Sequence, residues 1–129
     1  MKTVDKFMRF FEELPEKCPP AEAADQAHPS VFRFVPAADV SRDHFLSHAA
    51  LGKFLPKVDP CVLAACSLFS STDCPGFKKA SKLPKFKKSK IAELSLPQGA
   101  GESVTDKSGH INFWMYSHFD PVAAVVRVF

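Results

Sequence analysis

The chain has 129 residues, 46% of them hydrophobic and 24% charged, and a formal net charge of +3. This length fits a single domain with a hydrophobic core. No apolar stretch approaches the roughly 20 residues of a membrane-spanning helix, and the N-terminal sequence lacks the pattern of a secretory signal. These properties argue against a transmembrane or secreted protein and predict a cytoplasmic location.

The first 30 residues predict a helix followed by a linker. Thr3 can cap an amphipathic helix over residues 1–14, in which large apolar side chains recur at helical spacing until Pro15 ends it. Residues 15–30 are rich in Pro, Ala and acidic residues, as linkers often are. We favour packing of the helix on the domain, and docking into a partner's groove is the alternative.

Residues 31–129 predict an α+β domain. It begins with a short strand over residues 31–35, which places Arg33 on one face and two phenylalanines on the other. Asp39 or Ser41 can then cap a helix that continues to residue 51.

The segment 61–69 is apolar on all sides, which indicates a buried element. Asp59 and Pro60 precede it, and these residue types often begin a helix. Its Ala and Leu content favours a helix, with a buried strand as the alternative.

Residues 77–90 carry the basic character of the chain. Seven lysines and no acidic residue occur among these fourteen positions, whereas the rest of the chain has ten basic and fourteen acidic residues. Because Pro84 argues against one continuous helix, we expect a basic loop. Such a loop can bind an anionic partner through its lysines, which are Lys78, Lys79, Lys82, Lys85, Lys87, Lys88 and Lys90. A solvated loop without a partner is the alternative.

The last part of the chain completes a predicted sheet. Residues 91–96 and 110–116 alternate apolar and polar side chains as strands do, and residues 122–129 fit a final strand or a helix. Residues 97–109 hold three of the five glycines and predict a long polar loop. The expected fold is a mostly antiparallel sheet of four to five strands with two or three helices.

The polar sides of the strands suggest a binding face beside the lysine loop. If they share one side of the sheet, that face carries Arg33, Glu93, Ser95, His110, Asn112, Trp114 and Tyr116. Aromatic rings on a polar sheet face are typical of proteins that stack single-stranded nucleic acid. We expect the contacts to come from Arg33, His110, Asn112, Trp114 and Tyr116. An ordinary solvated or helix-covered sheet face is the alternative.

Histidines and cysteines give weaker signals. His44 and His48 are four residues apart on a predicted helix, but HFLSH lacks the glutamate of the zinc-protease motif. We predict no metal site and keep these two histidines as the candidate ligands. In a reducing compartment we expect free thiols at all four cysteines, which are Cys18, Cys61, Cys66 and Cys74.

Catalysis is the alternative to binding. The candidate nucleophiles follow the apolar segment 61–69 and are Ser70, Ser71, Thr72 and Cys74. The candidate general bases are His44, His48, His110 and His118. In this interpretation a nucleotide-type pocket is lined by Arg33, Ser71, Glu93 and His110.

The order of Arg33, then Ser70-Ser71-Thr72, then Glu93 or Glu102 is similar to the Arg, Ser-Thr-Ser, Glu order of one class of ADP-ribosyltransferases. Here SST stands in place of STS, and the Glu-x-Glu of that class is absent. The resemblance implies that the Arg and Ser position NAD and that the Glu stabilises the reacting ribose.

The sequence favours a binding or accessory protein over an enzyme. The predicted partner is a nucleic acid or an acidic protein surface, and a place in a larger complex is compatible with either. No cofactor is predicted.

Overall fold

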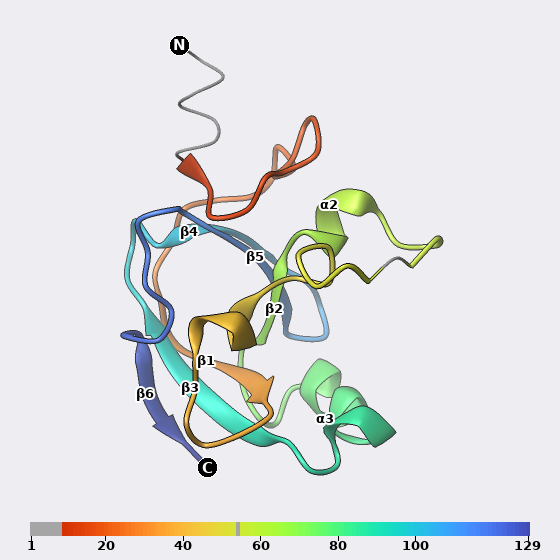
Figure 1. Cartoon of the computed structure of the whole chain (residues 1–129), viewed down its shortest axis with the longest axis vertical. Coiled ribbons are helices and arrows are strands. Elements are labelled where there is room, and N and C mark those ends of the chain that lie inside the picture. Colours follow the sequence, from red (N-terminus) through yellow and green to blue (C-terminus); the bar gives the residue numbers. More distant parts are fainter. Residues whose placement is uncertain (1–8, 54) are drawn as a thin grey trace.

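The computed structural model describes residues 9–53 and 55–129, which form one antiparallel sheet with short helices beside it (Figure 1). The strands are β1 (His28–Val35), β2 (Cys66–Phe69), β3 (Lys90–Leu96), β4 (Gly101–Thr105), β5 (His110–Met115) and β6 (Val125–Val128). They lie in the order β4-β5-β2-β1-β3-β6, and all neighbouring pairs are antiparallel. The prediction of a small α+β domain with an antiparallel sheet is confirmed, but the sheet has six strands rather than four to five.

The strand that the sequence did not predict is β4, which lies inside the predicted loop 97–109. Its sequence, GESVT, has little of the apolar alternation that marks a strand, but it forms a hairpin with β5. Two residues close the turn between these strands. The Asp106 N–H donates to the His110 carbonyl at 2.9 Å, and Gly109 has a φ of 85°, which glycine adopts without strain.

The helical elements are short. They are η1 (Arg42–Phe45) and η2 (Pro84–Phe86), both 3-10 turns, with α2 (Pro60–Leu63) and α3 (Pro75–Ser81). The predicted helix up to residue 51 is thus reduced to η1 and the turns after it. The segment 61–69 combines both alternatives, since α2 ends at Leu63 and β2 begins at Cys66. Figure 1 shows α2 and α3 at opposite ends of β2.

In the two described ranges, no helix has both the length and the apolar character needed to cross a membrane.

The main hydrophobic core covers one face of the sheet. It includes the inward side chains of four strands, among them Val31, Val35, Leu68, Leu94 and Ile111. In β3 and β5 this is the face predicted from the alternating pattern. In β1 it is the face that carries Arg33, because Arg33 pairs with the core residue Ala92, whereas the phenylalanines of β1 lie on the opposite side.

The two central strands β1 and β2 diverge, and Arg33 fills the gap between them. Their only Cα partners are Phe32 and Phe69. The Arg33 guanidinium donates to the Ser67 carbonyl at 2.8 Å, and on the side of η1 it donates to the carbonyls of His44 at 2.8 Å and Leu46 at 3.2 Å. Arg33 of β1 is thus bonded to β2 and to the η1 region at the place where direct pairing of β1 with β2 stops.

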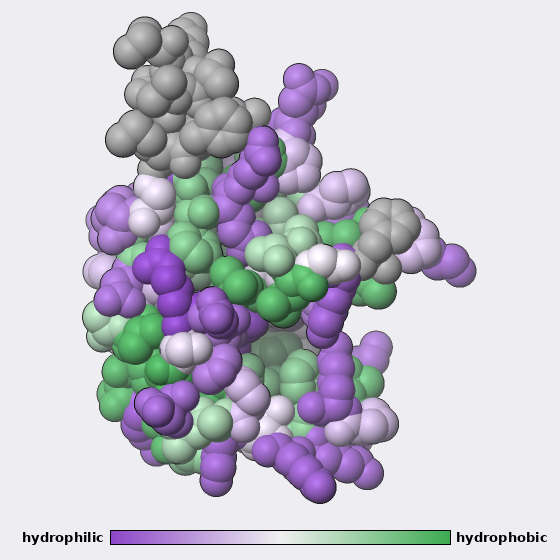
Figure 2. All heavy atoms as spheres, in the orientation of Figure 1, coloured by the Kyte–Doolittle hydropathy of each residue, from purple (hydrophilic) through white to green (hydrophobic). Residues whose placement is uncertain are grey.

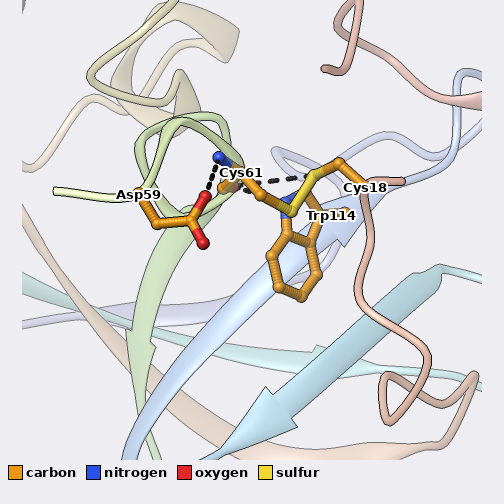
Figure 3. The surroundings of a disulfide bond; sticks show 4 residues. All are labelled: Cys18, Asp59, Cys61 and Trp114. Carbon is orange, nitrogen blue, oxygen red and sulfur yellow. Dashed lines mark hydrogen bonds between the residues drawn. A yellow bond between two sulfur atoms is a disulfide. The ribbon is translucent and has the colours of Figure 1, made fainter. Parts of the chain in front are cut away.

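A disulfide bond joins Cys18 to Cys61 (Figure 3). The expectation of four free thiols is therefore wrong for this pair, while Cys66 and Cys74 are free. Beside the disulfide, the Trp114 indole N–H donates to the Cys61 carbonyl at 2.9 Å, and the Asp59 carboxylate caps α2 by accepting from the Cys61 N–H at 2.8 Å. Because disulfides are typical of oxidising compartments, the cytoplasmic location stays a prediction.

The segment predicted as a linker packs on the sheet. Ala24 exchanges two backbone hydrogen bonds with Ser103 of β4, at 3.1 and 2.9 Å. Ahead of this segment, Phe10 forms an isolated antiparallel bridge with Tyr116, and Glu12 accepts hydrogen bonds from the buried Ser47. Most of the predicted helix 1–14 lies outside the described residues.

Candidate functional site

A pocket of about 700 Å³ lies between η1 with the turns after it and α3 with η2, over β2 and the start of β5. Figure 2 shows this hollow on the face turned toward the viewer, between the levels of α2 and α3, with hydrophilic residues at its sides and hydrophobic residues along its upper edge. Its volume falls within the range of roughly 300–1,000 Å³ that is usual for small-molecule sites. The pocket is therefore large enough to hold a small-molecule ligand.

Stacked phenylalanines hold the lysine-rich segment 77–90 against the sheet. Phe34 of β1 stacks on Phe77 of α3 and on Phe86 of η2, with ring centroids 4.8 and 4.4 Å apart. Phe69 of β2 packs edge-on against both Phe34 and Phe77. The segment is thus an ordered wall of the pocket rather than a loop, and it breaks at Pro84 as predicted, since α3 ends before Pro84 begins η2.

Among the charged side chains of the pocket lining, cations outnumber carboxylates. The four cations are Arg33, Lys53, Lys79 and Lys85, and the two carboxylates are Asp43 and Asp106. Burial lowers the pKa of His48, and the nearby charges of Lys85, Lys53 and Arg33 lower it further. The buried Nδ1 atom of His48 has no hydrogen-bond partner within the described residues. This environment favours an anionic ligand.

A serine and a histidine form a hydrogen bond at the pocket wall. The Ser67 Oγ lies 2.5 Å from the His110 Nε2. The two residues belong to adjacent strands, and because Phe69 is opposite His110 in the register, Ser67 is a diagonal neighbour on the same face. Burial lowers the pKa of His110, and Asp106 acts in the opposite direction. The imidazole is therefore neutral near pH 7.

Asp106 lies behind this histidine. Its Oδ2 is 3.9 Å from the His110 Nδ1, and its Oδ1 accepts hydrogen bonds from the Ser108 N–H, the Ser108 hydroxyl and the His110 N–H. Partial burial acts to raise the pKa of Asp106, but these hydrogen bonds outweigh it and lower the pKa. The ionised carboxylate favours the tautomer with the proton on Nδ1, in which Ser67 donates to Nε2.

Two of the four residues predicted to line a nucleotide-type pocket meet there, namely Arg33 and His110. Ser71 lies outside the lining, where its Oγ accepts from the Asp73 N–H. Glu93 accepts hydrogen bonds from Arg127 at 2.6 Å and from Ser30 at 2.8 Å, away from the pocket.

Glu102, the other glutamate considered for this role, pairs with Arg9 at 2.8 Å. No glutamate among the described residues lines the pocket. The ribose-stabilising role implied by the ADP-ribosyltransferase resemblance thus has no counterpart in its lining.

The residues predicted to form one aromatic binding face are distributed over both sides of the sheet. Arg33 is on the main core face, whereas His110, Asn112 and Trp114 are on the other. Trp114 is only 2% exposed and Tyr116 only 9%. Both rings pack in a cluster beside the disulfide, so neither is available to stack on a base in this structure.

The remaining candidates have other contacts. The His44 Nδ1 accepts from the Ser41 N–H at 3.1 Å and closes η1. Across residues 9–53 and 55–129, no group of three or more His, Cys, Asp or Glu side chains is placed to hold a metal ion. Like Ser71, the catalytic candidates Ser70, Thr72, Cys74 and His118 lie outside the pocket lining.

Sequence reasoning missed Ser67 and Asp106. Ser67 is a polar residue within an apolar run, and only the strand alternative for that run places it opposite the core residues Cys66 and Leu68. Asp106 belongs to a turn, and its role depends on the hairpin that brings it back to His110. The only sequence signal for this site was the possibility that the segment 61–69 contains a strand, which would have pointed to Ser67.

Comparison of the chain with protein-family models, with curated proteins and with solved structures finds no match.

Proposed function

We propose that the pocket binds a nucleotide-type ligand, which combines phosphate groups with a planar ring. The observation that carries this proposal is the lining, where four cationic side chains lie beside the apolar surface of Phe34, Phe69 and Phe86. Lysine and arginine bind phosphate oxygens, and aromatic rings provide flat apolar surface for a base. Lys79 and Lys85 belong to segment 77–90, so the anionic partner expected for that segment is here a small ligand.

Calorimetric titration with NAD, ATP and an uncharged nucleoside tests the proposal. NAD is the first ligand to examine, because the resemblance of the Arg and Ser order to ADP-ribosyltransferases implies it. We expect the charged nucleotides to bind and the nucleoside to bind more weakly. Trp114 fluorescence is a poor reporter, since its indole is buried in a cluster outside the pocket lining.

Two double variants separate the pocket from general charge. Lys79→Glu with Lys85→Glu reverses two charges in the lining and should weaken binding by about tenfold or more, equivalent to about 1.4 kcal/mol per decade. Lys82→Glu with Lys88→Glu makes the same charge change outside the lining and should have a much smaller effect. Failure of every nucleotide to bind the folded protein, or an equal loss in the two double variants, would contradict the pocket proposal.

A second candidate function rests on the lysines outside the pocket. These five, Lys78, Lys82, Lys87, Lys88 and Lys90, are exposed, and none forms an ion pair within the described part of the chain. Such a surface favours a large anionic partner, a nucleic acid or an acidic protein face. For such a partner, Lys82→Glu with Lys88→Glu should reduce the salt-dependent binding of single-stranded RNA more strongly than Lys79→Glu with Lys85→Glu does.

A further inference from the structure

The hydrogen-bonded pair of Ser67 and His110 has the geometry of an activated hydroxyl. Both residues line the pocket, and the His110 side chain is 28% exposed, so a bound molecule can reach the pair. A serine becomes a nucleophile when a neighbouring base accepts its proton, and the base is more effective when a carboxylate holds its tautomer. His110 meets the first condition at its Nε2. The Asp106 carboxylate lies 3.9 Å from Nδ1, beyond hydrogen-bond distance, and its negative charge favours a proton on that nitrogen.

We infer that Ser67 is the nucleophile and His110 the general base of an acyl-transfer site, whose substrates are carboxylic esters that carry an anionic group. Asp106 acts through His110 and is a positioning residue. The inference does not depend on nucleotide binding, because it rests on the serine and histidine and not on the identity of the pocket's ligand.

The reaction has two stages. The Ser67 Oγ forms a bond to the ester carbonyl carbon while its proton passes to the His110 Nε2. The tetrahedral adduct then breaks the bond to the alkoxide, which takes the proton from Nε2 and leaves as an alcohol, so that the acyl group remains on Oγ. Water attacks this acyl-serine and gives its proton to Nε2, and the proton returns to Oγ as the carboxylic acid leaves.

The charge of the pocket supports an anionic ester. Four cations line the pocket against two carboxylates, which attracts a negatively charged substrate. The same positive environment stabilises the negative charge that develops on the carbonyl oxygen in the tetrahedral adduct. An ester without an anionic group should therefore react more slowly than one of equal leaving group that has one.

Covalent labelling with an alkyl fluorophosphonate tests the inference. In this reaction the Oγ–phosphorus bond forms, fluoride leaves and the Ser67 proton passes to His110. Intact-mass measurement and peptide mapping should find one adduct, at Ser67, in the wild-type protein and none in Ser67→Ala. His110→Asn should label about 100-fold more slowly, the scale of general-base catalysis. Ser95→Ala, which removes an exposed hydroxyl outside the pocket lining, is the matched control and should label as the wild type does.

The pH profile separates activation from a purely structural hydrogen bond. The labelling rate of the wild type should rise with pH and level off at an apparent pKa below about 6.5, the ordinary value for histidine. In Asp106→Asn this apparent pKa should fall further, since the Asp106 carboxylate acts to raise the pKa of His110. Absence of an adduct at Ser67 in the folded wild type overturns the inference, as does a labelling rate that is independent of pH or unchanged in His110→Asn.

Discussion

Replacement of Arg33 by lysine is the sharpest test of how the centre of the fold is held together. Lysine keeps the positive charge, but its single ammonium group cannot reproduce the planar fork of the guanidinium. In the wild type this fork donates to three carbonyls that belong to β2 and to the η1 region, at 2.8, 2.8 and 3.2 Å. The variant should therefore retain one of the three hydrogen bonds at most.

The magnitude follows from the two hydrogen bonds that are lost. A hydrogen bond to a charged group contributes roughly 1.5–3 kcal/mol. Because Arg33 is only partly buried, the lower end of this range applies to each bond. Arg33→Lys should therefore lower the free energy of unfolding by about 3 kcal/mol. For a chain of this size, 1 kcal/mol corresponds to a change in Tm of about 4 °C, which gives a fall of about 12 °C.

Thermal unfolding followed by circular dichroism measures this change, with urea unfolding as the equilibrium check. The matched control is Arg127→Lys, since Arg127 forms a surface pair with Glu93, and surface ion pairs contribute little to stability. If Arg33→Lys unfolds within about 3 °C of the wild type, the guanidinium does not hold β1 to β2. A variant of unchanged stability that loses nucleotide binding would instead assign Arg33 to the ligand.

Two further predictions concern the disulfide and three partly buried histidines. The double variant Cys18→Ser, Cys61→Ser should lose about 4 kcal/mol in urea unfolding, because the crosslink spans 43 residues and restricts the unfolded chain; equal stability of the two proteins would refute this role. Burial lowers the pKa of His28, His48 and His110. Since the unfolded chain then binds more protons, stability should be full above pH 6.5, near the unfolded value, and should decline as the pH falls below it. Urea midpoints that stay constant between pH 7.5 and 5.5 would contradict the sign of these shifts.

The strands that the sequence predicted correctly have alternating side chains on a half-buried sheet. Residues 91–96 and 110–116 show this alternation, and they became β3 and β5 with the expected faces in the core. β4 could not be predicted in the same way, because GESVT has one apolar side chain and gains its place from the hairpin with β5. The segment 61–69 was predicted as a single element, because the four-residue helix α2 and the four-residue strand β2 lie in one apolar run.

Only part of the candidate site could be predicted from the sequence. The lysine segment and its phenylalanines were visible, but which side of the pocket they would form depends on the stacking of Phe34 with Phe77 and Phe86. The inference of a common face for Arg33 and Trp114 failed because it took the phenylalanines of residues 31–35 as the core side. The pairing of Ser67 with His110 depends on the register of two strands that are far apart in the chain.

The two backbone hydrogen bonds between Ala24 and Ser103 have a consequence for self-association. β4 is an outer strand of the sheet, and its free side would otherwise present unpaired N–H and C=O groups to other chains. Ala24 occupies the donor and acceptor of Ser103, at the middle of this five-residue strand. The segment that contains Ala24 is fastened by the Cys18–Cys61 disulfide six residues earlier, so a covalent bond outside the strands helps to keep that edge closed to strand addition.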